Sequence, residues 1–288
     1  MVQQESQNGM SDILTRASPS PGKRVQYGAD PIQFAELRFP PGKGPFPLLF
    51  VIHGGWWLSA NDLHHIGHLC TKFTSYGIIT CNLEYRRIGD LGGGWPGTFL
   101  DVANAVEYFK KGLASDPRVN IKRAAILGHS AGGHLALWLG AKHRLPRSSI
   151  LYTGRDRWLI ATISLAGITD LRSAWELGLG DNGVEKLIGG SPNQLPERYA
   201  EASPMELLPF GLKEFLIHGR NDDRVPISQS ERFAKTARAA GDKTTLIALD
   251  DIGHFELIDP ESRAWDIVAH STLTAFGDGS VDEPIVEP

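Results

Sequence analysis

The most informative stretch of this chain is Ala124-Ala125-Ile126-Leu127-Gly128-His129-Ser130-Ala131-Gly132-Gly133. Its first four residues form a short apolar run, which is typical of a buried strand, and a helix-like pattern follows from residue 131. Between them lies a Gly-x-Ser-x-Gly turn, in which the serine backbone is strained and both outer positions need glycine because side chains would collide there. The sequence therefore predicts a strand, a sharp turn and a helix, with the Ser130 hydroxyl at the apex.

A second turn lies upstream, where the apolar run 48–52 leads into His53-Gly54-Gly55-Trp56-Trp57. Such a turn can direct backbone N–H groups at an oxyanion, and the loss of one such donor typically costs about 3 kcal/mol of transition-state stabilisation. We expect the donors to be the N–H groups of Gly55, Trp56 and Ala131. The alternative is a plain glycine turn that carries two core tryptophans.

A serine nucleophile needs a histidine that accepts its proton and a carboxylate that orients the imidazole. In sheet enzymes of this kind the chain order is serine, acid, histidine, and three histidines follow Ser130 at sufficient distance: His218, His254 and His270. His218 ends an apolar run ahead of any acid loop, and His270 lies in the pattern of a packed helix. His254 lies in a loop directly after the predicted strand 244–249, so we expect it to be the base.

The acid is expected in the loop that follows the preceding strand, residues 218–226. Two carboxylates compete there. Asp222 lies in the middle of the loop, whereas Asp223 adjoins Arg224 and could form a solvent-exposed pair or a charge at a helix N-terminus. The residues alone leave both alternatives open.

Four motifs in this order resemble those of the α/β-hydrolase superfamily, and the resemblance extends from about residue 25 to about residue 275. They are His53-Gly-Gly-Trp-Trp57, Gly128-His-Ser-Ala-Gly-Gly133, His218-Gly-x-x-Asp222-x-x-Val-Pro226 and Gly253-His254. The resemblance implies that Asp222 is the acid. Within the superfamily the motifs are similar to the esterase, hormone-sensitive-lipase-like and kynurenine formamidase branches. Trp56 stands where many esterases carry a third glycine, which narrows the pocket.

Short apolar runs and helix-like segments alternate along the chain. The expected strands are 33–39, 48–52, 78–83, 124–127, 159–165, 214–217 and 244–249, and the expected helices are 63–76, 98–113, 131–143, 228–240 and 260–276. This alternation predicts an α/β fold, the α/β-hydrolase fold, with a mostly parallel sheet covered by helices on both faces. Active groups then gather at the carboxyl ends of the strands.

The alternation also predicts the domain organisation. One hydrolase domain spans 23–276, between a flexible N-terminal segment, 1–22, and a flexible acidic tail, 277–288. The interval 166–212 is too long for a simple connection, so we expect a small cap over Ser130. The alternative is an extra packed helix without substrate contact.

Composition excludes several classes of partner. The formal net charge of the 288 residues is −4, which argues against nucleic acid and anionic membranes as partners.

No apolar run approaches the ~20 residues of a membrane span, and the polar N-terminus lacks the apolar core of a signal peptide, so we expect a cytoplasmic protein. Cys70 and Cys81 are expected as buried free thiols. The sequence leaves oligomerisation, including a homodimer, open.

No metal or organic cofactor is expected. His64, His65 and His68 share a helix face, but no nearby cysteine or carboxylate completes a site. Substrate-pocket residues are expected among the motif and tryptophan positions: His53, Gly54, Trp57, Trp95, His129 and Trp175.

The expected function is that of a serine hydrolase that acts through an acyl-enzyme on carboxylic esters of short-chain or aryl acyl groups. The alternative, which the resemblance to kynurenine formamidase implies, is an arylformamidase that would cleave an N-formyl aromatic amide. A peptidase is disfavoured because the chain has no second large domain to gate peptides. An inactive ligand-binding protein is disfavoured because such proteins usually lose a triad member, whereas Ser130, Asp222 and His254 are all present.

Overall fold

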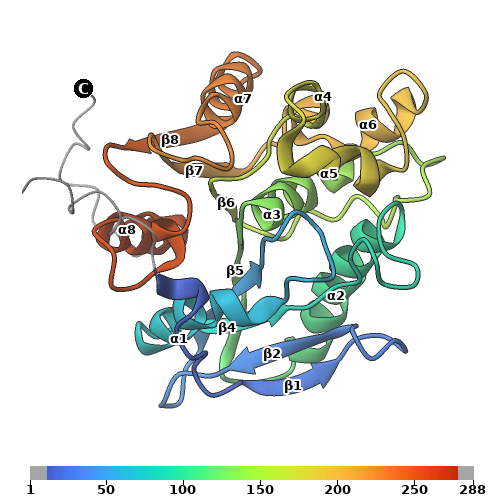
Figure 1. Ribbon diagram of the computed structural model, residues 1–288. Helices are drawn as coiled ribbons and strands as arrows, with labels where there is room; N and C mark the ends of the chain where they lie inside the picture. Colours follow the sequence, from blue (N-terminus) through green and yellow to red (C-terminus); the bar gives the residue numbers. More distant parts are fainter. Residues whose placement is uncertain (1–11, 278–288) are drawn as a thin grey trace, which may run out of the picture.

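The alternating apolar runs build one eight-stranded sheet in the computed structural model, which describes residues 12–277 (Figure 1). Its strand order is β1-β2-β4-β3-β5-β6-β7-β8. The strands are β1 (Lys23–Gln26), β2 (Phe34–Arg38), β3 (Phe46–Ile52), β4 (Ile79–Leu83), β5 (Val119–His129), β6 (Ala161–Leu165), β7 (Lys213–Gly219) and β8 (Lys243–Leu249). Along the order β4-β3-β5-β6-β7-β8 every neighbouring pair is parallel. Strand β1 pairs antiparallel with β2, and β2 pairs antiparallel with β4. The predicted, mostly parallel sheet is therefore confirmed, with β1 as a strand that was not predicted.

Helices cover both faces of the sheet (Figure 1). The α-helices are α1 (Gly67–Ser75), α2 (Gly97–Leu113), α3 (Ala131–Ala141), α4 (Leu171–Glu176), α5 (Leu179–Ile188), α6 (Pro196–Ala202), α7 (Ser228–Ala239) and α8 (Trp265–Ala275). Helices α1 and α8 pack on one face with Phe73 and Val268, and α2, α3 and α7 pack on the other with Phe99, Leu135 and Phe233. Because successive strand residues point to opposite faces, β7 contributes Leu216 to one cluster and Ile217 to the other. Both faces of the sheet are thereby removed from water.

Short 3₁₀ helices connect these elements: η1 (Asp12–Leu14), η2 (Leu63–Ile66), η3 (Lys142–Arg144), η4 (Pro204–Leu207) and η5 (Glu256–Ile258). The segment expected as the start of the last helix, 260–264, consists of turns, so α8 begins at Trp265. Cys70 and Cys81 are buried free cysteines. No helix within residues 12–277 is both long and apolar enough to cross a lipid bilayer.

The interval 166–212 forms α4, α5, α6 and η4, which lie together beside α3 (Figure 1). Helix α5 is interrupted near its start, where Gly180, Asp181 and Asn182 all have positive φ. An added Cβ at Gly180 would lie 2.2 Å from the Trp56 indole, so the interrupted turn packs directly on that ring. The insertion thus reaches the loop that carries Trp56.

Residues 12–22, which belong to the segment predicted to be flexible, contact the domain at several points. The Ile13 side chain is buried at 1% exposure. The Arg16 guanidinium donates two hydrogen bonds to Asp259, of 2.9 and 3.1 Å. Figure 1 shows η1 beside α1 and the loop that precedes α8. The remainder of the predicted terminal segments, 1–11 and 278–288, lies outside the described residues.

Candidate active site

Ser130 lies at the sharp turn between β5 and α3. Its φ of 57° and ψ of −122° are strained for a residue with a side chain. An added Cβ at Gly128 would lie 2.0 Å from the Gly132 carbonyl oxygen, and one at Gly132 would lie 2.1 Å from the Ile52 carbonyl oxygen. Only glycine fits at these two positions because strand, turn and helix pack backbone to backbone. The Ser130 N–H donates to the Leu165 carbonyl at 2.8 Å, which ties the turn to β6.

Asp222 and His254 follow β7 and β8, which are neighbours in the sheet (Figure 1). His254 Nδ1 donates to Asp222 Oδ2 at 2.7 Å. Asp222 Oδ1 accepts the N–H groups of Arg224 and Val225, both at 2.8 Å. Asp223, the competing carboxylate, is 75% exposed and lies 3.5 Å from Arg224. The structure therefore brings Asp222, and not Asp223, to the imidazole.

The environment of Asp222 favours its ionised form. Burial acts to raise the pKa of this carboxyl, but hydrogen bonds from His218 and His254 hold the pKa well below its usual range. His218, which sequence reasoning set aside as the base, is fully buried behind the carboxylate, with Nε2 3.3 Å from Asp222 Oδ2. Its Nδ1 lies 2.8 Å from Ser230 Oγ. His218 is thus a positioning residue for Asp222.

Ser130 and His254 open into one cavity of about 240 Å³. The other residues that line it are Leu14, Gly55, Trp56, Asn61, His65, His129, Arg224 and Phe255. Among the described residues no hydrogen bond joins Ser130 Oγ to His254, and in unliganded enzymes this bond is often long and tightens when substrate binds. The cavity therefore brings the serine hydroxyl and the imidazole to the same space.

The loop after β3 runs against the serine turn. An added Cβ at Gly54 would lie 3.0 Å from Ser130 Cβ, so this approach also needs glycine. Both Gly55 and Trp56 have positive φ, and both line the cavity. Within residues 12–277 the N–H groups of Gly55, Trp56 and Ala131 have no protein acceptor, so these donors are free to bind an oxyanion.

Two polar residues that sequence reasoning missed hold this loop. Asn61 Nδ2 donates to the Gly55 carbonyl at 3.1 Å. Buried Glu84 accepts hydrogen bonds from His53 Nε2 at 2.9 Å and from the Leu63 N–H at 3.1 Å. His53 therefore supports the loop from behind and does not line the cavity.

His129 is the predicted pocket residue that lines the cavity beside the catalytic candidates. Its Nε2 donates to the His254 carbonyl at 3.0 Å, and the two rings lie 4.6 Å apart. Burial, His254 and His65 hold the pKa of His129 well below its usual range. Burial likewise lowers the pKa of His65 to about 4. Both side chains are therefore neutral at pH 7.

Three tryptophans and Gly54, predicted as pocket residues, do not line the cavity. Trp57 is fully buried and packs edge-on against His134, with ring centres 5.2 Å apart. Trp95 packs against Phe99, and Trp175 donates from Nε1 to Glu185 at 2.8 Å. The sequence does not specify which way adjacent loop residues point, so the directions of these side chains could not be predicted. No residue of the insertion 166–212 lines the cavity either.

The cavity also contains residues that the sequence did not single out. Phe255 and Arg224 adjoin motif positions, so proximity to His254 and Asp222 could have indicated them. Leu14 lies in a polar stretch and carried no such signal. Two of the three histidines considered as metal ligands make different contacts. Exposed His64 pairs with Asp62 at 2.8 Å, whereas His65 lines the cavity.

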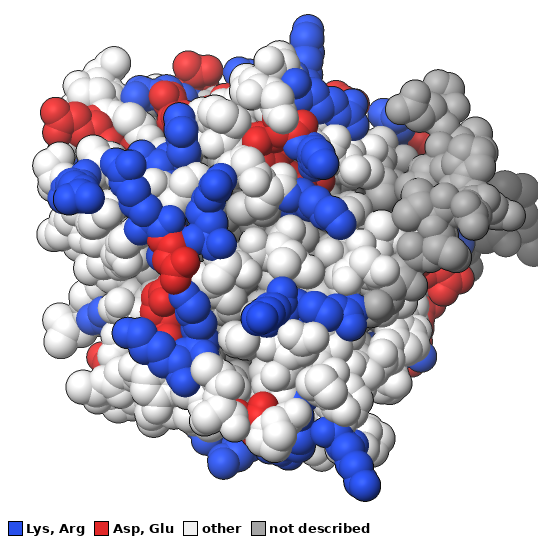
Figure 2. Space-filling model, turned by 180° about the vertical axis from the view of Figure 1, so that it is seen from behind, with Lys and Arg blue, Asp and Glu red and all other residues white. Residues whose placement is uncertain are grey.

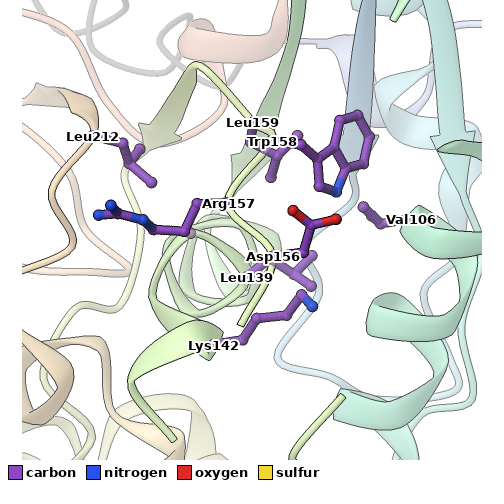
Figure 3. A pocket seen from close by; sticks show the side chains of 9 residues that line it. Val106, Leu139, Lys142, Asp156, Arg157, Trp158, Leu159 and Leu212 are labelled. Carbon is purple, nitrogen blue, oxygen red and sulfur yellow. The ribbon is translucent and has the colours of Figure 1, made fainter. Parts of the chain in front are cut away.

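Another hollow lies between α2, α3 and the segment 156–159 (Figure 3). In Figure 3, Asp156 points toward the same space as Lys142 and Trp158, while Arg157 points away from them. The enclosed volume is about 10 Å³, which holds at most one water molecule. Figure 2 shows Lys and Arg side chains spread over the face opposite to the view of Figure 1. The hollow in Figure 3 is too small to hold a substrate, unlike the cavity of about 240 Å³ at Ser130.

Comparison with known protein sequences finds esterases. Residues 37–236 match the BD-FAE family. Esterase LipC of Mycobacterium tuberculosis is 27% identical over 254 residues, which cover 82% of this chain and 60% of LipC. The probable carboxylic ester hydrolase LipM of the same organism is 28% identical over 71% of this chain and 48% of LipM. The chain spans about half the length of the curated relatives it matches.

Comparison with solved structures supports the fold. A truncated carbohydrate esterase from gut microbiota has a TM-score of 0.75 at 20% identity, covering 90% of this chain and 97% of its own. Esterase B from Lactobacillus rhamnosis has a TM-score of 0.73 at 19% identity, covering 88% of this chain and 84% of its own. The α/β-hydrolase fold predicted from the four motifs is thereby confirmed.

Proposed function

Because the chain belongs to the BD-FAE family of α/β-hydrolases, we propose that it is a serine esterase that acts on carboxylic esters of short-chain or aryl acyl groups. Ser130 is the nucleophile, His254 the general base and Asp222 the residue that orients the base. The observation that carries this proposal is the 2.7 Å hydrogen bond from His254 Nδ1 to Asp222, at the wall of the cavity that Ser130 lines.

The first half-reaction acylates Ser130. The hydrogen bond to Asp222 keeps the proton on Nδ1, which leaves Nε2 as the acceptor. His254 Nε2 takes the Ser130 proton as Oγ attacks the carbonyl carbon, and the carbonyl oxygen becomes an oxyanion. The N–H groups of Gly55, Trp56 and Ala131 stabilise this charge where it develops. His254 then returns the proton to the leaving alcohol as the ester bond breaks.

The second half-reaction releases the acid. A water molecule attacks the acyl group, His254 accepts its proton, and the proton passes to Ser130 Oγ as the acyl-oxygen bond breaks. Asp222 remains ionised throughout and stabilises the imidazolium that forms twice. The lowered pKa of Asp222 suits this role. Neutral His129, 4.6 Å from the His254 ring, adds no opposing positive charge.

An N-formyl aromatic amide is the second candidate substrate. The observation that favours it is the pair of aromatic side chains on the cavity wall, Trp56 and Phe255, because an aromatic group can pack against such rings. Comparison of kcat/KM for N-formylkynurenine with that for p-nitrophenyl acetate, butyrate and octanoate separates the two. A higher value for the amide would replace the ester assignment.

Replacement of the nucleophile tests the proposed mechanism. We expect Ser130→Ala to abolish hydrolysis of p-nitrophenyl acetate and labelling by a fluorophosphonate probe, with an unchanged circular dichroism spectrum. Ser75→Ala is the matched control, since this exposed serine ends α1. Retained turnover in Ser130→Ala would eliminate the mechanism.

A further inference from the structure

The cavity at Ser130 has an unbalanced charge. Arg224 is the one Lys, Arg, Asp or Glu among the described residues that line it. His65 and His129 are uncharged at pH 7 because burial lowers the pKa of each. The charge of Asp222 lies behind His254, to which it is hydrogen-bonded. A substrate in the cavity therefore meets one cationic group on the wall and no facing carboxylate.

The backbone of Arg224 is fixed relative to the catalytic candidates. Its N–H donates to Asp222 Oδ1 at 2.8 Å, while Oδ2 of the same carboxylate accepts the bond from His254. One carboxylate therefore positions both the general base and the start of the arginine side chain.

The guanidinium of Arg224 has unused hydrogen-bonding capacity. Its ion-pair partner is Asp223, at 3.5 Å from Nε, and the two side chains are 47% and 75% exposed. Exposed pairs of this kind contribute little. The terminal nitrogens of Arg224 have no acceptor within residues 12–277, whereas the neighbouring Arg220 contacts both Asp250 and Glu231. The planar fork is thus available for a carboxylate, which it can bind through two parallel hydrogen bonds.

We propose that Arg224 binds a carboxylate on the substrate, so that the preferred esters are anionic. This inference rests on the proposed esterase function and names the substrate class within it. The carboxylate can belong to the acyl part, as in a monoester of a dicarboxylic acid, or to the alcohol part. Two pairs of esters distinguish these sources.

The first pair places the carboxylate on the acyl part: mono-p-nitrophenyl glutarate against neutral p-nitrophenyl valerate. The second pair places it on the alcohol part: p-acetoxybenzoate against its neutral methyl ester. For one of the two pairs we expect wild-type kcat/KM to favour the anionic ester by about tenfold, the magnitude of one charge-assisted contact. The pair that shows the preference identifies the part of the substrate that faces Arg224.

Substitution of the arginine tests the cause of the preference. In Arg224→Gln we expect the anionic-to-neutral ratio to fall about tenfold, chiefly through KM, because the contact is present before and during the reaction. Arg224→Lys should retain part of the preference, since it keeps the charge without the fork. Raising the salt concentration should reduce the wild-type ratio and leave that of Arg224→Gln unchanged.

Arg220→Gln is the matched control, because Arg220 lies in the same loop but does not line the cavity. Its ratio should equal that of the wild type. A wild-type ratio near one for both pairs, or a ratio unaffected by Arg224→Gln, would overturn the proposal for Arg224 while Ser130-dependent hydrolysis of neutral esters still stood. Hydrolysis that persists in Ser130→Ala would instead overturn the esterase mechanism itself.

Discussion

At the scale of single residues, the geometry of the site converges on the two oxygens of Asp222. Oδ2 orients His254, and Oδ1 holds the backbone of the acid loop at Arg224 and Val225. An amide in place of the carboxylate keeps the shape but offers only one acceptor oxygen and no charge. With the oxygen on the loop side, the amide NH₂ faces Nδ1, and the imidazole must carry its proton on Nε2, where it cannot act as base.

We therefore expect Asp222→Asn to lower kcat by about 10⁴-fold, the magnitude that loss of the correct tautomer has in other triads. Steady-state hydrolysis of p-nitrophenyl acetate measures it. Asp223→Asn is the control, because Asp223 is exposed and makes no contact with His254. We expect it to retain wild-type kcat. Equal losses in the two variants would assign the acid role to the loop as a whole and contradict the assignment to Asp222.

Some residues of the site could be predicted from the sequence, and others could not. The Gly128 and Gly132 requirement could be predicted because a steric rule attaches to each letter of the motif, and the contacts of about 2 Å that a Cβ would make there explain it. The directions of Trp56 and Trp57 could not be predicted, since both have positive φ and the path of the loop decides which indole meets the cavity. Asn61 and Glu84 act through hydrogen bonds to the loop, which no local pattern reveals.

At the level of elements, the segment 12–22 contributes to the cavity although its polar composition gives no indication of this. Ile13 is buried, the Arg16 guanidinium binds Asp259, and Ser18 Oγ donates to the His64 carbonyl at 3.3 Å. These contacts place Leu14 on the cavity wall. The pairing of Arg16 with Asp259 joins residues 243 positions apart, so periodicity within the segment could not predict it.

Enlarging Leu14 should narrow the cavity. We expect Leu14→Trp to lower kcat/KM for p-nitrophenyl octanoate relative to the acetate by about tenfold, because poor accommodation of a few methylenes costs on the order of 1–3 kcal/mol. Leu91→Trp is the control, since Leu91 is 92% exposed and lies outside the cavity. An unchanged chain-length profile in Leu14→Trp would show that the acyl chain leaves the cavity by another side.

The alternation of apolar and amphipathic runs was sufficient to predict the sheet, because buried parallel strands need continuous apolar sequence. It failed where tertiary contacts replace periodicity. Strand β1 is Lys23–Gln26, whose mostly exposed residues pair with β2 at the sheet edge and carry no apolar signal. Helix α5 contains left-handed residues that pack on Trp56, a shape that helix propensity does not predict.

At the scale of the whole molecule, buried titratable groups set opposing dependences of stability on pH. Burial lowers the pKa of His65 and His134 to about 4 and that of His129 well below its usual range. Burial raises the pKa of Glu214 to about 8. The folded state binds fewer protons than the unfolded state at the histidines, and more at Glu214. Between about pH 4.5 and pH 6.5 the two effects therefore oppose each other, and the three histidines outnumber Glu214.

The sign for each group follows from linkage. A histidine with a lowered pKa contributes stability that is fully present above its unfolded pKa, near 6.5, and is lost as the pH falls toward about 4. Glu214 contributes stability that is fully present below its unfolded pKa, near 4.5, and is lost as the pH rises through about 8. Each group changes the free energy of unfolding by at most about 1.4 kcal/mol per pH unit.

We expect the free energy of unfolding, measured by chemical denaturation, to fall from pH 6.5 to pH 4.5, and the fall to be shallower in His134→Gln. Glutamine can keep the donor that binds the Ala202 carbonyl at 3.0 Å but does not titrate. His270→Gln is the control, because the His270 side chain is exposed on α8 and has no ion-pair partner within residues 12–277, so it should leave the slope unchanged. The slope, and not the absolute stability, is the readout, since any change at buried His134 alters packing against Trp57 and Phe99. Parallel pH curves for wild type and His134→Gln would contradict the linkage argument.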